Sequence, residues 1–85
     1  INPNLLGVIQ HNDYMYNTDL PGQDFAHFPV HNASDCRQAC QYDANCRSFT
    51  FVNPGVQGPD AMCWLKHSIP QAVASGHCTS GVVRP

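Results

Sequence analysis

Short alternations of apolar and polar residues along the chain predict β-strands. Residues 48–52 are Ser-Phe-Thr-Phe-Val, so an extended backbone places both phenylalanines on one side and both hydroxyl groups on the other. We expect this strand to have an inner, apolar side and an outer, polar side. Four further segments mix apolar and polar residues and are also predicted strands: 5–16, 25–30, 61–66 and 78–83.

Turn and loop residues separate these strands. Pro21 presets φ and Gly22 supplies a positive φ, which is the chemistry of a type II turn. Pro29 lacks an N–H donor and therefore belongs at a sheet edge or a strand end. Three polar segments with Gly or Pro are predicted loops: 17–24, 53–60 and 68–76, the last with one helical turn at most.

Residues 32–46 are predicted to contain the only helix. Asn32 or Ser34 can cap its N-terminus, and Asp35 suits the positive end of the helix dipole. Asn45 can adopt the left-handed conformation that ends a helix. The positions spaced i, i+3, i+4 and i+7 share one helix face: Cys36, Ala39, Cys40 and Asp43. Several short strands and one helix predict an α+β arrangement, in which a sheet covers one face of the helix.

The chain is short and rich in cysteine. Its 85 residues predict a single domain, residues 1–85, whose apolar core alone gives marginal stability. Five cysteines in so short a chain favour a disulfide framework and an oxidising, extracellular compartment. The sequence begins at Ile1 rather than Met, which suits a secreted chain whose signal peptide has been removed, a fragment of a larger protein or an expression product.

Charged residues make up only 12% of the chain, and the formal net charge is −2. Nucleic-acid binding is therefore not expected, because it requires clustered basic side chains that replace phosphate counterions. No apolar run approaches the length needed to span a membrane.

Helix geometry favours one arrangement of the disulfides. Any four of the five cysteines can pair in three ways, so leaving each in turn unpaired gives five times three, or fifteen, arrangements. Cys36 and Cys40 lie on successive turns of one helix face, so a bond between them would constrain little. A Cys40–Cys46 bond would pin the helix end, and a Cys36–Cys63 bond would fix the helix across the sheet. In the chain-entropy model these two closures contribute about 2 and about 3–4 kcal/mol. Spacing alone leaves the other pairings open.

Four runs of the sequence resemble the PAN/Apple domain, a module of many secreted proteins: NTDLPGQDF, CRQACQYDANCRSFTFVNPGVQGP, CWLKHSIP and CTSGVV. The resemblance covers about residues 14–83, and its most specific features are the C-x3-C-x5-C spacing and the Cys-Trp strand that follows. It implies one α-helix cradled by a short-stranded antiparallel sheet. It also implies the disulfides Cys36–Cys63 and Cys40–Cys46.

The fifth cysteine departs from the pattern. Many PAN/Apple domains add a third bond between their first and last segments; Cys78 matches its C-terminal half, but no cysteine precedes Cys36. An odd cysteine in a secreted module implies an intermolecular partner, a small-thiol cap or a buried sulfhydryl. Because its neighbours are small and polar, we expect Cys78 to be accessible at a domain edge and to link a homodimer or a neighbouring domain.

Neither a metal site nor catalysis is predicted, and no cofactor is expected. The helix cysteines have C-x3-C rather than C-x2-C spacing, and the histidines are scattered: His11, His27, His31, His67 and His77. Four of the five thiols are better explained as half-cystines than as nucleophiles. No serine elbow, phosphate loop or recognisable carboxylate pair accompanies them.

Four residues are candidates for ligand binding or modification. Trp64 follows Cys63, which should face the helix, so alternation places the indole on the opposite sheet face, either exposed for sugar stacking or packed beneath the 53–60 loop. Arg37 and Arg47 flank the helix and are either a small cationic patch for an acidic glycan or protein, or ordinary solvated side chains. Asn32 begins an N-glycosylation sequon that also has the features of a helix cap.

These observations predict a secreted, non-enzymatic recognition module. The resemblance implies adhesion to a carbohydrate or to another extracellular protein, and predicted loops on a rigid frame suit either ligand. Neutral polar and aromatic side chains slightly favour carbohydrate. The alternative is a structural subunit of an extracellular fibre, coat or matrix that associates with copies of itself.

Overall fold

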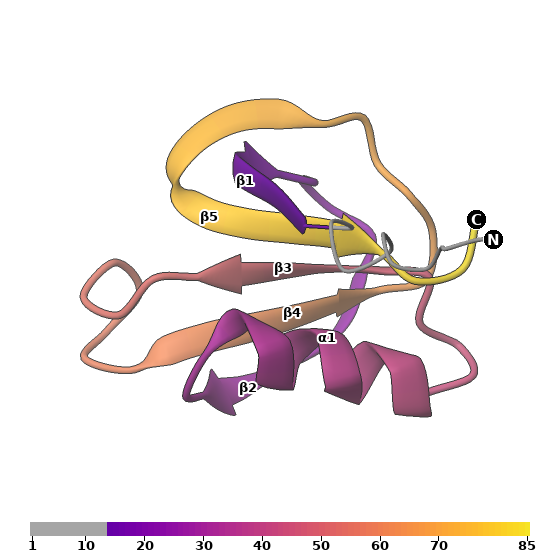
Figure 1. Ribbon diagram of the computed structural model, residues 1–85, viewed down its shortest axis with the longest axis horizontal. Coiled ribbons are helices and arrows are strands. Elements are labelled where there is room, and N and C mark those ends of the chain that lie inside the picture. Colours follow the sequence, from indigo (N-terminus) through magenta and orange to yellow (C-terminus); the bar gives the residue numbers. More distant parts are fainter. Residues whose placement is uncertain (1–13) are drawn as a thin grey trace, which may run out of the picture.

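A computed structural model of the protein describes residues 14–85 and contains, within that part, one helix packed against a five-stranded antiparallel sheet (Figure 1). The elements in chain order are β1 Tyr14–Asp19, β2 Asp24–Val30, α1 Ala33–Tyr42, β3 Ser48–Val52, β4 Ala61–Lys66 and β5 Val73–Val82. The predicted α+β class is confirmed. Residues 5–13 of the first predicted strand lie outside the described residues.

The sheet order is β1-β5-β3-β4-β2. β2 is therefore an edge strand within the described residues, which is where Pro29, with no N–H to donate, is tolerated. In Figure 1, α1 lies across β4 and β2, and β5 curls away from the helix around β1. No helix within residues 14–85 is long and apolar enough to cross a bilayer.

Asn32, one of the two residues predicted to cap the helix, caps the N-terminus of α1. The Oδ1 atom of Asn32 accepts a hydrogen bond from the Asp35 N–H at 2.8 Å. At the other end, the prediction for Asn45 is wrong. The helix ends at Tyr42, Asp43 is extended at φ −104° and ψ 113°, and Asn45 has no positive φ. No left-handed residue is needed there, because another side chain binds the terminal carbonyl groups.

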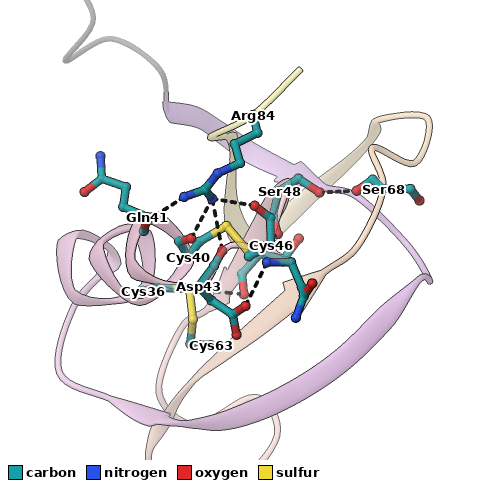
Figure 2. Close-up of a disulfide and its surroundings, with 11 residues drawn as sticks. Cys36, Cys40, Gln41, Asp43, Cys46, Ser48, Cys63, Ser68 and Arg84 are labelled. Carbon is teal, nitrogen blue, oxygen red and sulfur yellow. Dashed lines mark hydrogen bonds between the residues drawn. A yellow bond between two sulfur atoms is a disulfide. The ribbon is translucent and has the colours of Figure 1, made fainter.

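That side chain is Arg84, near the C-terminal end of the sequence (Figure 2). Its Nη2 donates to the Gln41 carbonyl at 2.7 Å. Its Nη1 lies within hydrogen-bonding distance of three more carbonyl oxygens: Cys40 at 3.0 Å, Asp43 at 3.1 Å and Cys46 at 2.7 Å. A cation at this position also complements the negative end of the helix dipole. Arg84 thus ties the last segment of the chain to the helix end.

Two disulfides attach the helix, and they are the pairings that the resemblance implied. Cys36 is bonded to Cys63 of β4, and Cys40 to Cys46 just beyond the helix; each pair has a Cα–Cα distance of 5.2 Å. All four half-cystines are fully buried. They form one cluster with the apolar residues of the sheet face beneath α1: Phe49, Phe51, Ala61 and Leu65. The core is therefore part covalent and part apolar.

Two strands are longer than the sequence predicted. β1 continues through 17–19 and β5 begins at Val73, five residues before the predicted strand, with no helical turn there. The reason is an irregular pairing between them. Tyr16 pairs with Thr79, but Thr18, two residues on, pairs with a β5 residue five positions back. Four residues of β5 therefore stand opposite Asn17 alone, a bulge that bends the strand.

The polar side of β3 is not an outer side, contrary to the prediction. Ser48 and Thr50 are as buried as Phe49 between them, and Leu20 and Ser80 of β5 both contact the Thr50 hydroxyl on this face. A chain of hydrogen bonds satisfies the buried hydroxyls. Thr50 Oγ1 lies 2.7 Å from Ser80 Oγ, which donates to the Thr18 carbonyl at 2.8 Å. Both faces of β3 are thus interior, one apolar and one polar.

Replacing Cys63 tests the longer disulfide. Cys63→Ser removes a closure across 27 residues and leaves Cys36 as a free thiol in the core. We expect the free energy of unfolding to fall by about 3–4 kcal/mol. The matched control Cys78→Ser breaks no bond within the chain, so its effect on the monomer should stay below about 1 kcal/mol. Urea unfolding of both variants measures the difference, and equal losses would contradict the assignment.

Replacing Arg84 tests the cap on the helix end. Arg84→Ala leaves the α1 carbonyl groups without their cationic donor, so we expect a loss of about 1–3 kcal/mol. Arg47→Ala is the matched control, since the Arg47 side chain is exposed and donates to the Pro85 carbonyl. Thermal unfolding monitored by circular dichroism compares the two. A loss for Arg47→Ala as large as that for Arg84→Ala would show that the cap is not specific.

Candidate functional site

A pocket of about 300 Å³ lies on the sheet face opposite α1. Its floor consists of alternate residues of β3 and β4: Thr50, Val52, Trp64 and Lys66. They share this face because the intervening phenylalanine, cysteine and leucine side chains point into the core beneath the helix. The same alternation that builds the core therefore assembles the pocket floor.

The three predicted loop segments 17–24, 53–60 and 68–76 all contribute to the pocket walls. Within them, the lining residues are Asp19, Pro21, Gly22, Asp24, Val56, Gln57 and Ser75. Their convergence results from the topology, since the first and third segments meet where β1 pairs with β5, and the second joins β3 to β4. Loops that are far apart in the sequence thus surround one site.

Trp64 lies on the sheet face opposite the helix, as alternation predicted. It is partly exposed and partly covered by the 53–60 loop. Its indole Nε1 donates to Gln57 Oε1 at 2.8 Å, so the 53–60 loop covers its edge. His27 of β2 stacks on the ring with centroids 4.4 Å apart and planes inclined by 18°. The half-buried indole nevertheless lines the pocket, on the side of β3. Trp64 is thus a fixed aromatic surface at the pocket floor.

A buried ion pair closes one end of the pocket. Lys66 is 2% exposed, and its Nζ donates to Asp24 Oδ1 at 2.5 Å and to the Gly22 carbonyl at 3.2 Å. Gly22 has φ +89°, which an L residue rarely adopts, and lets its carbonyl group turn to the lysine. The buried charge is therefore paired and hydrogen-bonded, as its desolvation requires. The pair anchors the 20–24 turn against β4.

Cys78 lines the same pocket. It is partly buried and forms no disulfide within the chain. Its Sγ atom lies 3.5 Å from Ser75 Oγ. The expected position at a domain edge is wrong with respect to the sheet, because β5 lies between β1 and β3 and Cys78 pairs with Val52. The structure thus brings together two candidates, Trp64 and Cys78, that the sequence treated separately.

The two candidate arginines and the sequon lie elsewhere. The Arg37 guanidinium lies over the Tyr14 ring, 5.8 Å from its centroid, and Arg47 donates to the Pro85 carbonyl at 3.1 Å. Neither lines the pocket that contains Trp64. Asn32 is exposed at the N-terminus of α1, where it caps the helix.

Most residues of the site were not predicted from the sequence, and His77 of β5, which also lines the pocket, is one of them. His27 supports Trp64 from the neighbouring strand, and Lys66 and Asp19 line the pocket. Their roles depend on cross-strand register, which the strand pattern did not predict. Over residues 14–85, no group of three or more His, Cys, Asp or Glu side chains is arranged to hold a metal ion.

The fold and its bonds define a small α+β domain stapled by two disulfides, with a mixed aromatic and polar pocket on its sheet. The sequence profile described as PAN domain matches residues 18–66, more than half of the chain, and the chain belongs to this family. No curated protein matches the chain in a sequence comparison. The PAN domain is a non-catalytic module known for recognising proteins and carbohydrates, and it occurs in extracellular proteins.

Proposed function

We propose that this PAN domain is a secreted, non-enzymatic recognition module that binds carbohydrate in the pocket around Trp64. The supporting observation is the indole itself, held at the pocket floor by Gln57 and His27. The C–H face of a sugar ring packs on an aromatic ring whose position is already fixed, so little side-chain entropy is lost on binding. The disulfides support an extracellular location.

The remaining lining suits sugar hydroxyl groups. Gln57, Ser75 and the Asp24 carboxylate place neutral and charged acceptors or donors in the same lining as the indole. A volume of about 300 Å³ is at the small end for ligand pockets and fits one or two sugar rings better than a folded protein surface. A protruding side chain of a protein partner is the competing ligand that the experiments must separate.

Sugar binding can be followed without a label, because Trp64 is the only tryptophan. In the reduced monomer, we expect neutral or amino-sugar oligosaccharides to change its fluorescence saturably, and to slow the alkylation of the free Cys78 thiol, which shares the pocket. Trp64→Ala removes the stacking surface, so affinity measured by calorimetry should fall at least about tenfold, equivalent to about 1.4 kcal/mol. Tyr42→Ala is the control, since Tyr42 is 82% exposed on α1.

Two outcomes would contradict carbohydrate recognition. One is an oligosaccharide array with no saturable ligand, together with large particles on size exclusion, which would favour the self-associating structural subunit. The other is equal loss of binding in the Trp64 and Tyr42 variants, which would place the ligand outside the pocket.

We also propose that a disulfide between two Cys78 residues links two copies of the chain. Because Cys78 lines the pocket, a second chain attached to its Sγ covers the pocket mouth. Native-source material should run at twice its monomer mass on a non-reducing gel, and reductant should both release the monomer and increase sugar binding. A monomer band with an inaccessible thiol would contradict the linkage.

Glycosylation of Asn32 is compatible with its role as a helix cap. The cap uses Oδ1, whereas an N-linked glycan is attached to Nδ2. We propose that Asn32, which is exposed, carries the glycan when the protein is made in a cell with N-glycosylation. The modified residue lies on the helix and not in the pocket lining.

A further inference from the structure

The charges in the pocket do not cancel. Three formally charged side chains line it: Asp19, Asp24 and Lys66. Lys66 is paired with Asp24, so these two neutralise each other. Within residues 14–85 the Asp19 carboxylate has no hydrogen-bond or ion-pair partner, and it is only partly buried. His77 also lines the pocket; with His77 counted as neutral, as in the formal net charge, the pocket carries one unopposed negative charge.

Lys66 is not available to balance Asp19 or to bind an acidic ligand. It is 2% exposed, and its ammonium group already donates to a carboxylate and to a backbone carbonyl. Turning it toward a ligand would break both bonds and leave Asp24 without its counter-ion. The Lys66 ammonium group thus holds the pocket wall together rather than binding a ligand. Asp19 is left as the charged side chain that a ligand meets.

We propose that the pocket selects sugars that carry a free, protonated amino group, such as 2-amino-2-deoxyhexoses, over neutral and acidic sugars. This inference rests on the proposed carbohydrate function. A sugar that enters the pocket displaces water from Asp19, and a cation compensates the carboxylate for that loss more fully than a neutral hydroxyl donor does. The face of Trp64 also attracts a cation more than a neutral group. An acidic sugar brings a like charge to Asp19 and is disfavoured.

Oligosaccharides of equal length and linkage separate the ligand charge from the ligand shape. The ligands are tetramers of glucosamine, N-acetylglucosamine and glucose with β-1,4 linkage, and a uronic acid tetramer. Each is titrated into the reduced monomer and followed by Trp64 fluorescence, at one pH at which the amine is protonated. We expect the glucosamine tetramer to bind about fivefold more tightly than the neutral tetramers, the gain from one partly exposed ion pair. The uronic acid tetramer should bind most weakly. Added salt should reduce the difference by screening the charges.

Two variants assign the preference to one carboxylate. Asp19→Asn keeps the shape of the side chain but removes its charge, so the ratio of the affinity for the glucosamine tetramer to that for the glucose tetramer should fall about fivefold. Asp60→Asn is the matched control, because it changes the net charge equally but Asp60 is exposed and lines a different hollow. Circular dichroism checks that both variants fold. If Asp19→Asn does not fold, the ligand comparison and the salt dependence in the wild-type chain still test the proposal.

The possible failures are distinguishable. If neutral tetramers bind as tightly as glucosamine, or if the two Asp variants behave alike, the amino-sugar preference is overturned and carbohydrate binding stands. If no tetramer binds, the proposed function itself fails. If propylamine, which has the charge but no sugar ring, binds as tightly as the glucosamine tetramer, the pocket recognises an amine alone, and the proposed sugar specificity is overturned.

Discussion

The bond between Cys36 and Cys63 is the constraint on which the rest of the structure depends. It joins α1 to β4, an interior strand of the sheet, and so decides which side of β4 faces the helix. Since side chains alternate, Leu65 then faces the core while Trp64 and Lys66 face away. A slip of one residue would bury the lysine beneath the helix. One covalent bond thus fixes both the core and the floor of the pocket.

The face opposite the helix is held by polar rather than apolar contacts. Thr50 and Ser80 hydrogen-bond across β3 and β5, and Lys66 holds the 20–24 turn through Asp24. Directional contacts of this kind require defined positions, whereas apolar packing tolerates small shifts. The pocket walls are consequently attached to the sheet by bonds with specific geometry. This arrangement suits a site whose ligand is to be bound in one orientation.

The sequence predicted the features that depend on local chemistry. The helix with its Asn32 cap, the edge position of Pro29 and the face of Trp64 follow from side-chain capping, a missing N–H and period-two alternation. The family pattern supplied the sheet and the disulfides. Errors occurred where a distant contact replaced a local signal, as at Asn45, whose expected role in ending the helix is taken by Arg84.

The bend of β5 was beyond sequence reasoning for the same reason. Residues 74–76, Ala-Ser-Gly, have weak strand propensity, and Val73 and Ala74 are held extended by their pairing with β1. Without that pairing, the residues around Cys78 look like an exposed loop at the end of the domain. The candidate residue Trp64 could be predicted, but its grouping with Asp19 and Cys78 required the register of strands far apart in the chain.

Because only 12% of the residues are charged, each charged side chain contributes a large share of the local electrostatic field. Of the four basic residues, Lys66 neutralises Asp24, Arg84 binds the helix end, Arg37 lies over Tyr14 and Arg47 holds the Pro85 carbonyl. All four are thus engaged with the protein itself, and none is directed at a ligand in the pocket. No lysine or arginine is therefore available to offset the charge of Asp19, and in a partly enclosed pocket its field is screened less than at an open surface. A single unopposed carboxylate in a pocket with an aromatic floor is thus the basis of the proposed charge preference.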